Sequence, residues 1–330
     1  MAVFTQLTEG EVAELLRTFS LGKFLALTPI ESGIENTNYF LTTEGGKWVL
    51  TVFERLKAEE LPFYLELCEH LAKKGCRVAR PQKTRTGELF TYVHGKPVAI
   101  ADCLPGEQIT TVTVTEARSM GDLLAKMHRA VRDFPLVQKN LRGLDWWIQT
   151  APKVRPFLNA GQQALLHEEL ARQIALSKTD GFKALTVGAC HCDLFKNNAL
   201  AEGIGTDKAH VSGVFDFYFA GCSPTLFDLA VTMNDWCIDS KTGRFIPELS
   251  QAFIDAYHAV NPLGAHERAL WRDMLRAAAL RFWLSRLFDF YLPRQAALLK
   301  PHDPTHFERV LTDRKTCTLP WPTEANRQFL

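Results

Sequence analysis

The first hundred residues alternate between short apolar runs and polar turns, a pattern typical of strands joined by hairpins. Apolar and β-branched residues gather in three runs, at 27–30, 38–42 and 47–53. Gly45-Gly46 separates the last two runs, and a glycine pair suits a tight hairpin turn, so we expect an antiparallel meander of three strands. Two more strands are predicted near 88–92 and 96–101.

One segment within this region has the features of a helix. Residues 61–75 carry Pro62 in the first turn, lysines in the last turn and Gly75 directly after them. Proline is tolerated at the start of a helix, and glycine is favoured just past its end. The chain before Leu104-Pro105-Gly106 therefore predicts a small antiparallel sheet with one main helix.

After residue 104 the apolar positions recur with a period near 3.6, which is typical of helices. Four segments have this spacing, at 115–129, 161–176, 247–259 and 265–291. We therefore predict an α+β fold of two lobes, in which 1–103 form a small antiparallel-sheet lobe and 104–330 a larger, mostly helical lobe. This is the arrangement of the protein-kinase-like bilobal fold.

Two polar motifs fall between the predicted helices. His191-Cys192-Asp193-Leu194-Phe195-Lys196-Asn197-Asn198 is followed by Asp216-Phe217, which ends the strand-like run 211–215. His-x-Asp-Leu-x-x-x-Asn and then Asp-Phe are the catalytic-loop and metal-loop motifs of protein-kinase-like phosphotransferases. Phosphoryl transfer requires a group that accepts the hydroxyl proton and hard oxygen ligands for Mg²⁺. We therefore predict Asp193 as the base, Asn198 and Asp216 as Mg²⁺ ligands, and His191 as a structural support of the loop.

An alternative interpretation makes Asp193 and Asp216 ordinary turn residues beside buried strands, since Asp and Asn are common in loops. The two motifs, however, occur in the right order and are separated by a polar stretch and a strand-like run, which favours a kinase. A P-loop of the form Gly-x-x-x-x-Gly-Lys-Ser/Thr is absent from the sequence.

Composition narrows the class of protein. A chain of 330 residues with 46% apolar and 23% charged residues can bury a full core in one or two domains. A net charge of +1 does not favour nucleic acid as a partner. Because no apolar run has the length of a membrane span and residues 1–6 lack the features of a signal peptide, we expect a cytoplasmic protein without a membrane partner. The oligomeric state is left open.

The eight cysteines have no framework spacing, so we expect reduced thiols that serve as packing residues. A zinc site built from Cys190, His191, Cys192 and His210 is disfavoured. Neighbouring residues on a strand or loop point in opposite directions, and no Cys-x-x-Cys pair accompanies them.

The spacing after the metal motif distinguishes small-molecule kinases from protein kinases. Asp228 follows Asp216 by only 12 positions, too few for a long phosphorylatable activation segment, and no Ala-Pro-Glu follows. Cys192 stands where a protein kinase has the arginine that holds a phosphorylated loop. Regulation by loop phosphorylation is therefore not expected.

On these residues the chain resembles the superfamily of aminoglycoside phosphotransferases and choline kinases, and within it the bacterial homoserine kinases. The catalytic motifs are common to the superfamily. Other strings resemble the homoserine kinases in particular, among them 35–40, 49–54, 61–63, 142–146, 234–237 and 281–286. The resemblance implies ATP-dependent phosphorylation of L-homoserine to O-phospho-L-homoserine, a step of threonine biosynthesis.

The resemblance also implies where ATP binds. The loop 32–38 would cover the phosphates, with backbone N–H groups of Ser32, Asn36 and Thr37 as donors. In the alternative interpretation, the loop 32–38 is a plain hairpin turn. The adenine is expected at the hinge backbone, from Ala101 to Cys103. The first lobe would thus bind nucleotide, and the second would hold the catalytic loop, the metal loop and the acceptor site.

Two further positions have competing interpretations. Asp228 would be a buried aspartate that braces the catalytic loop, or else an ordinary helix N-cap. Thr51 stands where protein kinases carry a lysine on the third strand, and Lys47 on the same strand face is about 13 Å away. Since the resemblance places threonine there as well, we interpret Thr51 as part of a variant nucleotide site. A catalytically inert nucleotide-binding protein is the alternative.

The acceptor site is predicted on the helix that includes 277–289. Arg281, Ser285 and Asp289 are four residues apart on one largely apolar face. In one interpretation Arg281 and Asp289 belong to a structural network. In the other, Arg281 or Arg286 binds the acceptor carboxylate, and Asp235 or Asp289 pairs with its ammonium group. Choline, methylthioribose, an amino sugar or an aminoglycoside are alternative acceptors, but the many arginines of the C-terminal third favour a carboxylate.

Overall fold

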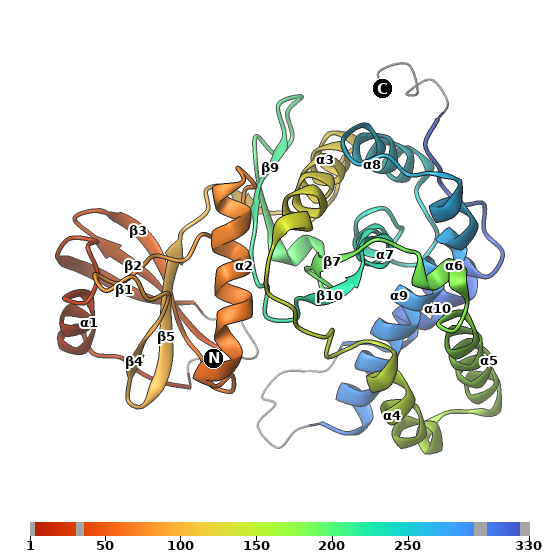
Figure 1. The fold of residues 1–330 in the computed structure, drawn as a ribbon, viewed down its shortest axis with the longest axis horizontal. Helices are drawn as coiled ribbons and strands as arrows, with labels where there is room; N and C mark the ends of the chain where they lie inside the picture. The colour runs from red at the N-terminus through yellow and green to blue at the C-terminus, as the bar shows by residue number, and fades with distance from the viewer. Residues whose placement is uncertain (1–3, 31–35, 294–301, 324–330) are drawn as a thin grey trace. The chain divides into compact units, whose positions relative to one another are not determined.

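The computed structural model describes residues 4–30, 36–293 and 302–323 (Figure 1). The chain divides into two compact units. The first ends at Pro105, and the second begins at Gly106 and includes most of the remaining chain. The roles predicted for the lobes 1–103 and 104–330 stay predictions.

Unit 1 is built on a five-stranded antiparallel sheet with the strand order β1-β2-β3-β5-β4 (Figure 1). Its strands are β1 (Phe24–Ile30), β2 (Thr37–Thr43), β3 (Gly46–Val52), β4 (Thr91–Val93) and β5 (Lys96–Asp102). Two helices, α1 (Glu9–Leu16) and α2 (Leu61–Lys73), accompany the sheet. Buried residues of α1 and of the strands, among them Val12, Leu41 and Leu50, form one hydrophobic cluster. The predicted meander and the predicted main helix are confirmed.

Two details of unit 1 differ from the prediction. The strand expected near 88–92 is only the three-residue β4, because Gly87 N and Glu88 N both donate to Thr84 and fold 84–88 into a turn. Helix α1 was not predicted. It begins with a capping box, in which the Thr8 side chain accepts from Glu11 N and the Glu11 side chain accepts from Thr8 N.

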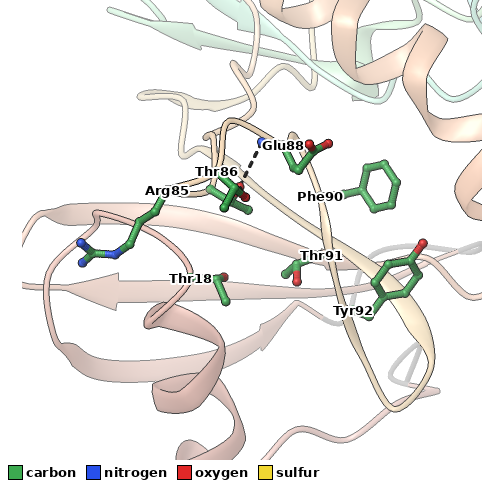
Figure 2. Close-up of a pocket in the computed structure, with 8 residues that line it drawn as sticks. Thr18, Arg85, Thr86, Glu88, Phe90, Thr91 and Tyr92 are labelled. Carbon is green, nitrogen blue, oxygen red and sulfur yellow. Dashed lines mark hydrogen bonds between the residues drawn. The ribbon is translucent and has the colours of Figure 1, made fainter.

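The 84–88 turn and β4 line a hollow of about 440 Å³ on unit 1 (Figure 2). The rings of Phe90 and Tyr92 lie edge to face there, with centroids 5.8 Å apart. Arg85 Nε donates to the carbonyls of Arg17 and Phe19, so this side chain fastens the turn to the end of α1. The hollow contains none of the predicted site residues.

Unit 2 is mainly helical (Figure 1). Its helices are α3 (Val114–Ala130), α4 (Leu144–Val154), α5 (Ala160–Leu176), α6 (Asp180–Lys183), α7 (Thr225–Trp236), α8 (Pro247–Val260), α9 (Ala265–Tyr291) and α10 (Thr305–Arg314). Its strands pair as β7 (Val187–Cys190) with β10 (Gly221–Pro224), and as β6 (Glu107–Gln108), β8 (Ala199–Glu202) and β9 (His210–Val214) in that order. Helices α3 and α8 pack so closely that a Cβ on Gly121 would lie 2.2 Å from Phe253 O.

The four helices predicted in this region are confirmed as α3, α5, α8 and α9, with ends within one residue of the prediction. Helix α7 was not delimited from the sequence, because every residue from Thr225 to Asn234 is buried and the helix has no polar face. Within the described part of the chain, none of the helices combines the length and hydrophobicity that a membrane span requires.

Candidate active site

The two motifs meet through strand pairing. The loop 191–198 connects β7 to β8, and β8 pairs with β9 in a register that sets Ala199 opposite Val214. One residue beyond this pair, Phe215 N donates to Asn198 O at 3.0 Å. Because Phe215 precedes Asp216, the ends of the catalytic and metal loops are fixed side by side.

The backbone at both motifs is unusual. Cys192 and Asp216 have φ angles of 63° and 65°, in the left-handed region that non-glycine residues seldom adopt. Such conformations are often held at functional sites by the surrounding hydrogen bonds. Asp216 is exposed.

Asn198 is buried and its amide is oriented from within the loop. Its Nδ2 donates to the carbonyl of Asp193 at 2.8 Å, which leaves Oδ1 as the atom that can bind a cation. A neutral amide oxygen and a carboxylate on adjoining loops match the hard oxygen ligands that Mg²⁺ prefers.

The Asp193 side chain is 20% exposed and makes no hydrogen bond with the described residues. The nearest described cation is Arg281, whose Nη2 lies 3.6 Å from Asp193 Oδ1. Burial raises the pKa of Asp193 above its ordinary value of 3.8, and the charges of Arg281 and His191 act in the opposite direction. The carboxylate is therefore a stronger proton acceptor than a solvated aspartate.

His191 links the two loops. Its Nε2 donates to the carbonyl of Phe215 at 3.0 Å, and its ring packs on Phe217 with centroids 4.4 Å apart. A carbonyl only accepts, so the proton must be on Nε2.

Asp228 holds the beginning of the catalytic loop. It lies in the first turn of α7, is fully buried, and accepts from His191 N at 3.1 Å and from Cys192 N at 2.7 Å. The N-cap interpretation is wrong, since Pro224 occupies that position. Burial by itself would raise the pKa of Asp228, but hydrogen bonds from His128 and Cys192 and the charge of His191 lower it below 3.8.

A chain of buried donors ends at the same carboxylate. Asn261 Nδ2 donates to Tyr257 Oη at 2.9 Å, Tyr257 Oη lies 2.7 Å from His128 Nδ1, and His128 Nε2 lies 3.0 Å from Asp228 Oδ2. The sulfur of Cys190 is close enough to His128 and Asp228 for a metal site. The carboxylate already accepts three hydrogen bonds, so we interpret the group as a structural network.

The other end of α7 holds the end of the loop. Asp235 Oδ2 accepts from Lys196 N at 2.8 Å, and Trp236 Nε1 donates to the carbonyl of Leu194 at 3.1 Å. From the sequence, Asp235 was predicted only as a partner for an ammonium group, and its contact with the loop was not predicted. A role of Asp235 in acceptor binding would therefore fall to its other carboxylate oxygen, Oδ1.

Helix α9 carries the predicted acceptor residues. Arg281 is 4% exposed, Arg286 is half-buried with its guanidinium 5.8 Å from the centroid of Phe307, and Asp289 is exposed. No ion pair joins Arg281 to Asp289, and Asp193 is the only described carboxylate within 4.0 Å of Arg281. The structural network proposed for Arg281 and Asp289 is therefore not found in the described chain.

Comparison with known proteins decides the family. The model of the phosphotransferase enzyme family matches residues 26–271. A homoserine kinase from Cupriavidus necator is 51% identical over 97% of this chain and 100% of the relative, and one from Janthinobacterium sp. is 51% identical over 94% and 95%. The chain belongs to the homoserine kinase family.

Solved structures agree with this placement at the level of the fold. An amicoumacin kinase, solved in complex with AMP-PNP and Ca²⁺, has a TM-score of 0.69 at 16% identity and covers 96% of each chain. A choline/ethanolamine kinase family protein from Mesorhizobium loti has a TM-score of 0.60 at 16% identity, over 93% of this chain and 92% of that one. The predicted protein-kinase-like fold is confirmed.

The predicted nucleotide residues of this homoserine kinase family member lie in unit 1. Ser32 is outside the described residues. Thr37 is fully buried, and its hydroxyl accepts from Phe4 N and donates to Glu54. Only backbone groups of Asn36 and Thr37 were predicted to contact phosphates, so this burial does not conflict with the prediction. Ala101 and Cys103 are half-buried at the end of β5.

Thr51 has a definite partner in unit 1. Its hydroxyl donates to Asn38 Oδ1 at 2.8 Å, across the register that pairs Asn38 with Thr51. Lys47, at the start of the same strand, is exposed. Thr51 is thus a satisfied polar residue of the β2–β3 ladder.

Proposed function

We propose that this chain transfers the terminal phosphoryl group of ATP to the side-chain hydroxyl of L-homoserine, which yields O-phospho-L-homoserine and ADP. The observation that carries the proposal is the near-full-length identity of 51% to a homoserine kinase. The arrangement of Asp193, Asn198 and Asp216 supports the same chemistry.

Asp193 is proposed as the base. The acceptor hydroxyl would donate to its carboxylate while the hydroxyl oxygen forms a bond to phosphorus and the bond to the ADP oxygen breaks. The proton then moves to Asp193, whose pKa is already raised by burial. His191 and Asp228 keep the loop in the conformation that presents this carboxylate.

Asn198 Oδ1 and the Asp216 carboxylate are proposed to hold Mg²⁺. When bound, the ion would neutralise charge on the phosphates of ATP. In unit 1 the backbone N–H groups of Ser32, Asn36 and Thr37 would bind the phosphates. The backbone from Ala101 to Cys103 would contact the adenine.

Arg281 and Arg286 are proposed to face the acceptor carboxylate, and Asp235 and Asp289 to be available to its ammonium group. Arg281 is closest to the base. A guanidinium suits this role because its planar fork binds a carboxylate through two parallel hydrogen bonds.

The substrate can be tested with the purified full chain. ADP release with Mg²⁺ and ATP is measured for L-homoserine, choline, methylthioribose and an aminoglycoside, and the product is identified by mass spectrometry. We expect L-homoserine to have the highest kcat/KM. A clear preference for choline or methylthioribose would refute the substrate assignment and leave the fold unaffected.

Asp216→Asn should raise the Mg²⁺ concentration required for half-maximal activity by at least about tenfold, because a neutral amide replaces a charged ligand of the ion. Titration of ADP release with Mg²⁺ measures this effect. Asp207→Asn, which removes an exposed carboxylate from the β8–β9 loop, is the matched control and should leave the titration unchanged. If the Mg²⁺ concentration for half-maximal activity were unchanged in Asp216→Asn, Asp216 would be excluded as a ligand of the ion.

A further inference from the structure

Arginine side chains from two segments far apart in sequence interact electrostatically around Arg281, the cation beside Asp193. Arg281 and Arg286 come from α9, and Arg142 immediately precedes the N-cap of α4. The pKa of Arg281 is lowered to about 10, mainly by burial; the charge of Asp193 opposes this shift, and the charges of Arg142 and Arg286 add to it. Like charges gathered in a poorly solvated place are unfavourable unless an anion joins them.

The Arg281 guanidinium is buried but lacks hydrogen-bond partners in the described part of the chain. Its central carbon lies 3.7 Å from the centroid of Phe282 and 5.6 Å from that of Phe219. Its closest carboxylate oxygen, on Asp193, is 3.6 Å away. A guanidinium has five N–H donors that can bind an anion. The side chain is thus held in position by stacking, with its donors available to a ligand beside the base.

Arg142 approaches the same ring. Its guanidinium lies 5.8 Å from the centroid of Phe219 and 4.5 Å from that of Trp146. Because Phe219 follows Asp216 by three residues, the metal loop supplies the ring that both arginines share. Both guanidiniums therefore lie near one ring of the metal loop, and Arg281 also lies beside Asp193.

The backbone around Arg142 is rigidly attached to the catalytic region. Arg142 N donates to Asn140 Oδ1 at 2.8 Å, and Asn140 Nδ2 donates to Ser223 Oγ on β10 at 2.9 Å. Strand β10 approaches so closely that a Cβ on Gly221 would lie 2.6 Å from Asn140 Cα. Since β10 pairs with β7, which leads directly into His191, the position of Arg142 is fixed relative to the catalytic loop.

We propose that Arg142 and Arg281 together bind the α-carboxylate of the acceptor and so select amino-acid alcohols over amino alcohols. The inference rests on the proposed function and adds to it a residue, Arg142, that lies outside the catalytic and metal motifs and was given no role from the sequence. Two guanidiniums around one aromatic ring offer a carboxylate paired hydrogen bonds from two directions. With the carboxylate fixed there, the hydroxyl of the same molecule is directed to Asp193.

The transferred phosphoryl group is a second anion that would pass close to Asp193. The two sources of negative charge can be separated with 3-amino-1-propanol, which has the carbon chain, hydroxyl and amine of homoserine but no carboxylate. A residue that contacts the carboxylate matters only for homoserine. A residue that contacts the phosphoryl group matters equally for both acceptors.

The test compares kcat/KM for both acceptors in the unmodified full chain, in Arg142→Met and in Arg118→Met, a control on the exposed face of α3. For Arg142→Met we expect the KM for L-homoserine to rise at least tenfold and the KM for ATP to change less than twofold. The kcat/KM for 3-amino-1-propanol should also change less than twofold. Arg142→Lys should fall between Arg142→Met and the unmodified chain, because it keeps the charge without the fork.

Equal losses for the two acceptors in Arg142→Met would overturn the proposal and assign Arg142 to the phosphoryl group or to the fold. Unchanged kinetics with homoserine would overturn it as well. If Arg142→Met fails to fold, Arg142→Lys decides by the same ratio of the two acceptors. Absence of homoserine turnover in the unmodified chain would refute both the proposed function and this inference. If only the role of Arg142 is wrong, the unmodified chain still phosphorylates homoserine, and the variants show the failure.

Discussion

Asp193→Asn is expected to lower kcat for homoserine by about 10²–10⁴-fold, the usual contribution of a general base. The asparagine amide cannot accept the hydroxyl proton. ATP binding should be retained, since the proposed metal ligands and the nucleotide residues are unchanged. Steady-state ADP release measures the loss, and equilibrium titration with ATP checks that binding persists.

Asp180→Asn is the matched control for this variant. Asp180 is fully exposed in the first turn of α6 and makes only a loose contact with Lys183.

In the unmodified chain kcat/KM should fall as the pH falls through the pKa of Asp193, because the base must be ionised. Since burial raises that pKa, the acidic limb should lie above 3.8. If Asp193→Asn had a kcat close to that of the control Asp180→Asn, the assignment of Asp193 as the base would be refuted.

Asp228→Asn is expected to reduce the free energy of unfolding by about 3–5 kcal/mol, as when one partner of a buried ionic network is removed. The amide has one acceptor atom for three donors, and in either orientation its NH2 group faces a backbone N–H group, that of His191 or that of Cys192. Urea titration measures the loss. Asp122→Asn, which removes an exposed pair with Lys126, should change stability by less than about 1 kcal/mol.

The stabilisation by Asp228 should also depend on pH. Its folded pKa is lowered, so the contribution is present above the unfolded value of 3.8 and is lost as the pH falls through the folded pKa. The unmodified chain should therefore lose stability in this acidic range, and Asp228→Asn should lose less. Equal stability of the two proteins at neutral pH would show that the carboxylate does not support the loop.

The sequence predicted those parts of the fold whose signals are local. Period-3.6 spacing located α3, α5, α8 and α9, and the glycine pair located the β2–β3 hairpin. Helix α7 was not delimited because it is buried on every side, and the short β4 was placed too early because a turn takes up 84–88.

For the candidate site, too, the residues with local sequence signals could be predicted, and the contacts that depend on packing could not. Asp193, Asn198 and Asp216 lie in short motifs that match those of the phosphotransferases, so they could be selected from the sequence. The contacts of Asp228 and Asp235 with the loop depend on the packing of α7, which no local pattern indicates. Arg142 and Arg281 are separated by more than a hundred residues, and both lie near the ring of Phe219. Trp146 lies four positions after Arg142 and Phe219 three positions after Asp216, which is a weak signal by itself.

Helix α7 has a consequence for the motions of this protein. Its first turn binds the start of the catalytic loop and its last turn binds the end, while nearly all of its side chains are in the core. Segments attached in this way open only when the surrounding core opens. The loop around Asp193 should therefore keep one conformation throughout the catalytic cycle, and the rearrangements that admit substrates and release products must take place in other segments of the chain.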